Sequence, residues 1–135
     1  MSKQKTYMGR KLEEYTALLA EIKIEEQKVN IITDDGSVTT ELKKAGIKDR
    51  LGELLKVEEK EYEELTGIIN ALPRGKQRQV MFARYIDGLP WKVINQLIFG
   101  ERQDFEEKKD NYQRTTYRIH GRALIKSDEI IKKNR

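Results

Sequence analysis

Apolar residues recur at alternating four- and three-residue steps from about Thr6 to Val29. This spacing predicts a helix with a narrow apolar stripe of the coiled-coil kind. Glu26 places a charge at one position of the stripe. The apolar members are Met8, Leu12, Tyr15, Leu19, Ile22 and Val29.

A second stripe follows after a loop. The run Ile31 to Ser37 combines β-branched residues with an Asp-Gly turn signal, so the first helix is expected to stop near Asn30. Thr39 or Thr40 can cap a second helix that runs to about Leu72. Its stripe has Glu58 as a polar exception and otherwise consists of Leu51, Leu55, Tyr62, Leu65, Ile69 and Leu72.

Two amphipathic helices joined by a loop usually fold back on each other, because neither stripe alone buries enough surface to be stable. Residues 1–72 are therefore expected to form a long helical hairpin that dimerises or binds a partner. Pro73, Arg74 and Gly75 interrupt the helical pattern, since the residue before proline avoids helical geometry. The break predicts a second domain at 73–135.

The second domain is predicted to contain three helices. The first covers Lys76 to Ile86 and ends at Asp87-Gly88. A short helix begins at Pro90, a favourable first-turn residue, and is expected to bury Trp91, Ile94, Leu97 and Ile98. After the charged stretch Glu101 to Asp110, a long helix runs from about Tyr112 to Lys132. With few prolines and many Lys and Glu, the fold class is all-α.

The last helix has two distinct faces at 100° per residue. Its expected inward stripe is Tyr112, Thr116, Ile119, Ala123 and Ile130. The opposite face holds Arg114, Arg118 and Gly121, flanked by Tyr117 and Arg122. Arginines one turn apart can contact guanine or phosphate, and a glycine beside them lets a backbone approach closely.

Charge is distributed unevenly between the halves. Residues 1–72 hold 12 Lys and Arg against 15 Asp and Glu, whereas residues 73–135 hold 15 against 8. A basic half indicates contact with a polyanion, and an acidic half indicates contact with protein; two solvated surfaces of different composition are the alternative.

Other functional classes receive little support. The chain has no cysteine and one histidine, so neither disulfides nor a metal site is expected. No nucleophile-base pair or phosphate-binding glycine loop can be assembled, so we expect no enzyme and no cofactor. The start Met1 to Lys5 lacks the apolar stretch of a secretory signal and no apolar run spans a bilayer, which predicts a cytoplasmic protein without membrane contact.

The order helix, turn, short helix, connector and basic helix is the layout of a helix-turn-helix. Trp91 is expected in the core, and His120 has a packing role or a base-reading role. Arg74, Lys76 and Arg78 are weaker candidates for phosphate contact. The expected DNA-binding residues are Arg114, Arg118, Arg122, Gln113, Thr115, Tyr117 and Gly121 on the last helix and Lys92, Asn95 and Gln96 on the short one.

Two strings resemble a known family. The residues Ala83-Arg-Tyr-Ile-Asp-Gly-Leu-Pro-Trp-Lys-Val-Ile94 and Thr116-Tyr-Arg-Ile-His-Gly-Arg-Ala-Leu124 resemble phage-encoded regulators with a sigma-factor region 4-like domain, the RinA/ArpU-type late transcription regulators. The resemblance covers about Leu72 to Ile131. It implies promoter-proximal DNA binding through Arg114, Arg118 and Arg122, but the stretch Glu101 to Asp110 departs from the tight turn of that pattern.

We therefore expect a sequence-specific transcriptional regulator, an activator of phage or mobile-element late genes. Its expected partners are double-stranded DNA, a second copy of the chain and, as a further candidate, RNA polymerase. The alternative is a protein-interaction module that binds or mimics part of the transcription machinery through the acidic hairpin. A DNA-packaging subunit that assembles into rings is a third interpretation.

Overall fold

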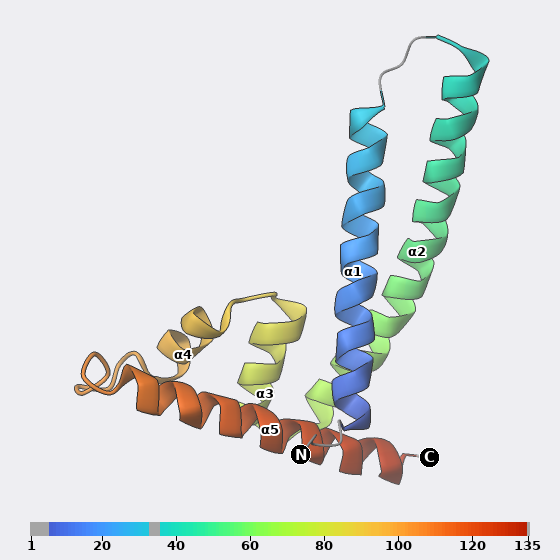
Figure 1. Cartoon of the computed structure of the whole chain (residues 1–135). Coiled ribbons are helices and arrows are strands. Elements are labelled where there is room, and N and C mark those ends of the chain that lie inside the picture. The colour runs from blue at the N-terminus through green and yellow to red at the C-terminus, as the bar shows by residue number, and fades with distance from the viewer. Residues whose placement is uncertain (1–5, 33–35, 135) are drawn as a thin grey trace, which may run out of the picture. The chain divides into compact units, whose positions relative to one another are not determined.

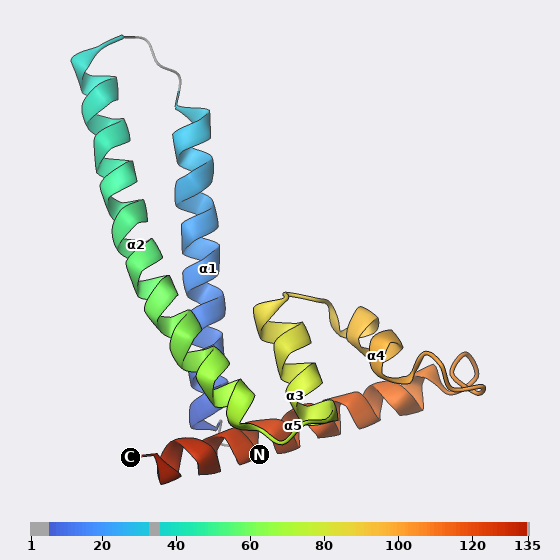
Figure 2. The ribbon, with the colours of Figure 1, turned by 180° about the vertical axis from the view of Figure 1, so that it is seen from behind.

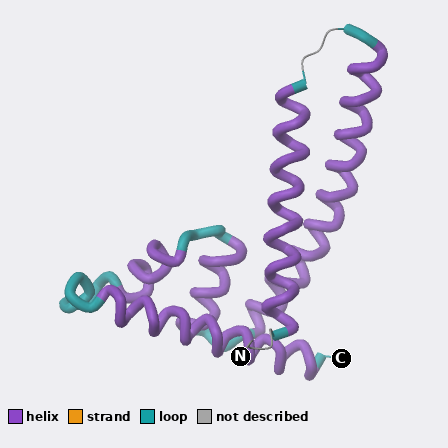
Figure 3. Tube along the Cα trace, in the orientation of Figure 1, coloured by secondary structure: helices purple, strands orange, loops and turns teal. Residues whose placement is uncertain are grey.

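All secondary structure in the described part of the chain is helical, as Figure 3 shows. The computed structural model describes residues 6–32 and 36–134. The predicted all-α class is confirmed, including the long N-terminal pair of helices. The elements are α1 (Tyr7–Ile31), α2 (Val38–Ala71), α3 (Lys76–Met81), a π-helical turn η1 (Phe82–Ile86), α4 (Trp91–Phe99) and α5 (Lys109–Lys133).

Two parts of the sequence-based interpretation, the basic start at 1–5 and loop residues 33–35, lie outside the described residues. None of the described helices combines the length and the apolar composition that a membrane span requires.

The chain divides into two compact units whose borders fall inside helices. One unit is Glu13–Glu64, and the other joins the chain up to Leu12 with Leu65–Arg135. The sequence predicts a border at Pro73, where the helical pattern is interrupted between α2 and α3. The compact units divide the chain at other positions. The start of α1 and the end of α2 belong with α3, α4 and α5 because their apolar residues share a core with them.

Within the unit Glu13–Glu64, α1 and α2 run antiparallel and side by side (Figures 1 and 2). The Tyr15 hydroxyl donates a 2.8 Å hydrogen bond to the Glu58 carboxylate. Burial, followed by this hydrogen bond, raises the pKa of Tyr15 above its ordinary value. Glu58, the polar exception of the second stripe, is therefore the partner of a buried tyrosine.

Tyr15 and Ile22 are buried as the stripe of α1 predicts, but two other predicted stripe positions are exposed. Leu19 and Leu55 are 39% and 46% exposed, whereas Ile47 is buried and Leu54 is half-buried. The contact positions in α2 follow the series that contains Ile47, Leu54 and Glu58, so Leu55 lies one residue beyond it. Buried apolar side chains are few here, namely Tyr15, Ile22 and Ile47.

Ser37 caps α2, in place of the Thr39 or Thr40 expected from sequence. Its hydroxyl accepts a 3.1 Å hydrogen bond from the Thr40 backbone N–H, and its carbonyl accepts one from Glu41. A serine at this position satisfies an N–H group that the first helical turn leaves free. The helix consequently begins at Val38.

In the other unit, α5 is the central helix. Figures 1 and 2 both show α3 and α4 lying against it. The core between these elements consists of Met8, Leu12, Leu65, Ile69, Leu72, Val80, Met81, Ile94, Phe99, Phe105 and Ala123.

Asp128 of α5 caps the first turn of α1. Its two carboxylate oxygens accept hydrogen bonds from the backbone N–H groups of Met8, at 2.7 Å, and Tyr7, at 2.9 Å. The Thr6 hydroxyl accepts a third, at 2.9 Å, from Gly9. A carboxylate is stabilising there because the N-terminus of a helix carries partial positive charge.

Arg78 performs the corresponding task at the end of α2. Its Nε and Nη2 donate to the Leu72 carbonyl at 3.1 and 2.8 Å, and Nη2 also donates to the Asn70 carbonyl. These carbonyls lack partners within the helix. Arg78, a weak candidate for phosphate contact, is thus engaged in holding the α2–α3 connection.

Candidate nucleic-acid interface

One exposed face of α5 carries three arginines at four-residue spacing, about 6 Å between successive members along the axis. Arg114, Arg118 and Arg122 are all exposed. Among the described residues none forms an ion pair with them, and Arg114 makes only a long 3.4 Å contact to the side chain of Asn111. The guanidinium groups are therefore available to an external anion.

Two further residues share this face and were not singled out from the sequence. Asn111 and Ile125 fall within one helical turn of the arginines at 100° per residue, and Ile125 is 58% exposed. The sequence signal for Ile125 is its place on the arginine side of the helix, where an apolar residue is out of step with the inward stripe.

The opposite face of α5 is the buried one, as predicted. Thr116 and Ala123 are buried, while Tyr112, Ile119 and Ile130 are half-buried. Ser127 continues this stripe as a buried polar residue. Its hydroxyl donates a 2.7 Å hydrogen bond to the Ala123 carbonyl, which satisfies the buried group within the helix.

Asn95 does not project outward as the sequence pattern suggested. It is 5% exposed, and its Nδ2 donates to the Lys109 carbonyl at 3.3 Å. The Thr116 hydroxyl donates to its Oδ1 at 3.1 Å. Asn95 occupies a core position one residue after Ile94, so it positions α5 against α4 and is unavailable to DNA.

The helical phase of α4 also explains why Leu97, which was expected to be buried, is exposed. Leu97 is 65% exposed, whereas Ile94 and Phe99 are buried. The buried side of α4 follows positions 91, 94, 95, 98 and 99, which is the usual series for one face of a helix. Leu97 lies outside that series.

Trp91 packs against α5 at the edge of the core and is half-buried. Its ring makes edge contacts with Tyr117 at 5.2 Å and His120 at 4.9 Å between centroids, and the Arg84 guanidinium lies 4.9 Å from it. Trp91, which was expected in the core, therefore lies at the margin of the core and packs there against α5. Tyr117 is 47% exposed beside it.

His120 points into this aromatic cluster. Its Nε2 shares a 2.6 Å hydrogen bond with the Tyr85 hydroxyl, and the two rings are stacked. Burial, and secondarily the charge of Arg84, lower the pKa of His120 below its ordinary value. The packing role is therefore the one that the structure gives to His120.

The remaining candidates divide between solvent and protein. Lys92 and Gln96 of α4 are exposed, and a side chain at Gly121 would meet open space. The Thr115 hydroxyl donates to the Asn111 carbonyl at 3.1 Å. The amide nitrogen of Gln113 is buried without a hydrogen-bond partner among the described residues, so Gln113 lies away from the arginine face.

The connection between α4 and α5 is anchored by Phe105. This ring is 5% exposed and stacks on Tyr112, whose hydroxyl donates to the Asp104 carboxylate. That hydrogen bond, with lesser help from Lys108, lowers the pKa of Asp104. The acidic stretch thus lengthens the turn, because α5 begins only at Lys109.

Two of its acidic groups are paired locally. Asp104 lies 3.4 Å from Lys108, and Glu106 lies 2.7 Å from Lys109. Both pairs are exposed and contribute little to stability, but they reduce the negative charge near the start of α5.

Comparisons with protein-family models, curated proteins and solved structures give no match for this chain. The resemblance to RinA/ArpU-type regulators therefore rests on the quoted residues alone. Within the part of the chain that the structure describes, no three His, Cys, Asp or Glu side chains gather as metal ligands would.

Proposed function

We propose that this protein is a sequence-specific DNA-binding transcriptional regulator, with α5 as the helix that enters the major groove. The observation that carries the proposal is the exposed row Arg114, Arg118 and Arg122, which has no ion-pair partner among the described residues. Unpaired arginines at one-turn spacing suit bidentate contacts to guanine and to phosphate.

The support of α5 favours the same function. Its inner face is held by Ile94 and Phe99 of α4, by the Asn95 hydrogen bonds and by the Trp91 cluster. A reading helix must be held rigidly from behind if its side chains are to select bases. Lys92 and Gln96, exposed on α4, would contact phosphates where the first helix of the motif crosses the backbone.

The connection between the two helices is longer than the usual helix-turn-helix turn of about three to four residues. Phe105 compensates for this length by fixing the connection to Tyr112. The more specific role, activation of phage or mobile-element late genes, derives from the two sequence strings given above. The proposal also includes RNA polymerase as a candidate partner, on the same two strings.

Footprinting over the DNA that surrounds the protein's own gene tests the proposal. A protected site whose affinity falls steeply with salt is expected, because arginine contacts release counterions. Uniform, weak binding to all sequences, or none at about 50 mM salt, would reject it.

The acidic hairpin unit favours a second candidate, a protein-interaction module. A module of this kind does not use the arginine row. Retained binding of a protein partner after loss of the three arginines would therefore support this second candidate.

A further inference from the structure

The unit Glu13–Glu64 is far more acidic than a division at Pro73 suggests. It contains 8 Lys and Arg against 15 Asp and Glu, while the rest of the chain contains 19 against 8. The two units therefore carry opposite net charge. The acidic one repels nucleic acid and attracts basic groups.

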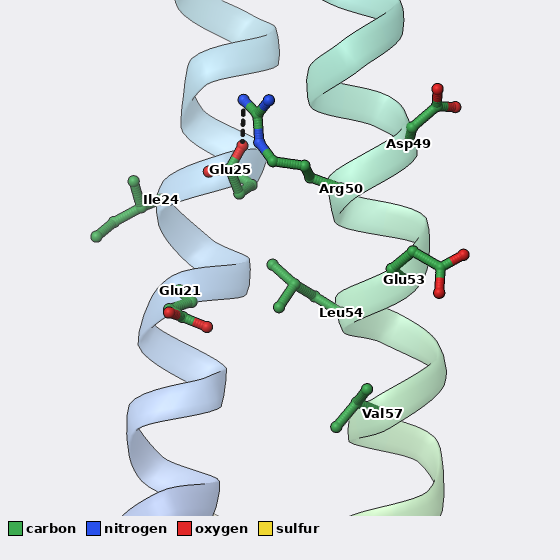
Figure 4. A pocket seen from close by; sticks show the side chains of 8 residues that line it. All are labelled: Glu21, Ile24, Glu25, Asp49, Arg50, Glu53, Leu54 and Val57. Carbon is green, nitrogen blue, oxygen red and sulfur yellow. Dashed lines mark hydrogen bonds and ion pairs between the residues drawn. The ribbon is translucent and has the colours of Figure 1, made fainter.

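A groove of 540 Å³ opens between α1 and α2 within this unit (Figure 4). Leu54 and Val57 of α2 point into the space between the helices, and Ile24 of α1 lies at its margin. Val57 and Ile24 are 50% and 53% exposed. An apolar surface of this kind, in a unit with few buried side chains, gains stability when it is covered.

Acidic side chains line the groove from both helices. Glu21 lies on the α1 side, and Asp49 and Glu53 lie on the α2 side. All three are exposed, and among the described residues their one ion pair is a loose 3.5 Å contact between Glu53 and Lys56.

One end of the groove is closed by charge pairing. Arg50 reaches across to Glu25 at 3.4 Å, and Lys28 lies 2.8 Å from the same carboxylate. The hydrogen bond from Lys28, with help from Arg50, lowers the pKa of Glu25. The single cation of the lining is thus neutralised, and the remaining rim is negative.

We propose that this groove is a docking site for a basic amphipathic helix of another protein. The apolar residues of that helix would cover Leu54, Val57 and Ile24, while its flanking Lys and Arg would face Glu21, Asp49 and Glu53. Binding of an amphipathic helix in a groove uses apolar anchors at helical spacing, and complementary charge sets its orientation.

Charge favours such a partner over a second copy of the chain. A copy of the same hairpin brings the same negative rim to the groove, and like charges across an interface are unfavourable. The proposal does not depend on DNA binding, because no residue of the arginine row belongs to this unit.

The test is fluorescence anisotropy on the full chain with a labelled synthetic helix of Leu and Lys in amphipathic order. A Leu and Glu peptide of the same pattern and a Ser and Lys peptide serve as controls. We expect saturable binding of the Leu and Lys peptide only. Val57→Ser together with Ile24→Ser should weaken it about tenfold or more, as loss of central anchors does.

Matched charge reversals separate the groove from the overall acidity. Glu21→Lys with Glu53→Lys should weaken binding at least as much, whereas Glu26→Lys with Glu59→Lys, exposed positions outside the groove, should change it much less. Circular dichroism checks that each variant is folded. Equal losses in both pairs, binding of the Ser and Lys peptide, or no binding would overturn the proposal.

Sedimentation of the same variants tests whether a second copy of the chain occupies the groove instead. A full-length dimer that dissociates in the Val57→Ser and Ile24→Ser variant would assign the groove to a second copy and reject the basic partner.

Discussion

Asn95 of α4 and Thr116 of α5 share a 3.1 Å hydrogen bond in the core, where the two side chains are 5% and 0% exposed. The Thr116 hydroxyl also lies 3.0 Å from the Tyr112 carbonyl of its own helix. Buried polar pairs of this kind are stable only while every member keeps a partner. The pair therefore fixes how α5 lies against α4.

Asn95→Ala should destabilise the protein by about 1 to 3 kcal/mol, because it leaves the Lys109 carbonyl without its side-chain donor and opens a cavity. Urea denaturation measures the change. Adding Thr116→Val should cost less than the sum of the single changes, since both remove one hydrogen bond. Gln96→Ala, the exposed neighbour, should shift stability by less than about 0.5 kcal/mol. Strict additivity would show that the two residues do not interact.

Changing Arg114, Arg118 or Arg122 to Ala should leave thermal stability unchanged, because all three are exposed. DNA affinity should fall. Loss of a bidentate base contact costs about 1 to 3 kcal/mol against the preferred base pair, whereas loss of a phosphate contact weakens all sequences and reduces the salt slope by about one unit.

Lys126→Ala is the matched control for these arginines, because Lys126 is exposed on the same helix but already lies 3.3 Å from Glu129. We expect a smaller effect on binding. Arginine variants that bind the footprinted site as the parent does, at equal salt, would remove α5 as the reading helix.

Acid should lower the stability of the folded protein through His120, its only histidine. Because burial lowers the pKa of His120, the unfolded chain takes up a proton at higher pH than the folded one. Stability is therefore present above the ordinary pKa of about 6.5 and falls as the pH drops through and below it. Denaturation at about pH 7.5 and about pH 5.5 measures the loss.

His120→Phe removes the titrating group but keeps a ring beside Trp91. Its stability at neutral pH should be lower, since the hydrogen bond between the His120 ring and the Tyr85 hydroxyl is lost. Its dependence on pH over the same interval should nearly vanish. An unchanged slope would mean that other groups are responsible.

Gly100 ends α4 at a position where a side chain does not fit. A Cβ there would clash with the Gln96 carbonyl oxygen, the acceptor of the Gly100 N–H. Gly100→Ala should cost about 1 to 3 kcal/mol, as overpacking does. Gly67→Ala, in the interior of α2 with open space around it, should instead stabilise by about 0.5 to 1 kcal/mol. Thermal denaturation distinguishes the two signs.

Sequence reasoning located most helices because their apolar spacing and their interruptions are local properties. It also separated the two faces of α5, since Arg114, Arg118 and Ala123 obey one helical period. It failed where polar residues are buried. Asn95 looks like a surface residue until its partners on α5 are known, and no local pattern reveals them.

The borders of the compact units were equally beyond local reasoning. Leu65 and Leu12 continue the stripes of their helices without any change in spacing, yet they belong to a different core from Tyr15. Which core a stripe residue joins depends on distant elements.

The Asp128 cap has a consequence for how the chain acquires its structure during synthesis. The carboxylate arrives 120 residues after Met8, the residue whose N–H group it binds. At about 5 to 20 residues per second, the start of α1 waits about 6 to 24 s on the ribosome for its cap. The hairpin between them, built from contacts closer in sequence, can form first. The unit that holds the arginine row is therefore expected to mature last, when α5 has emerged.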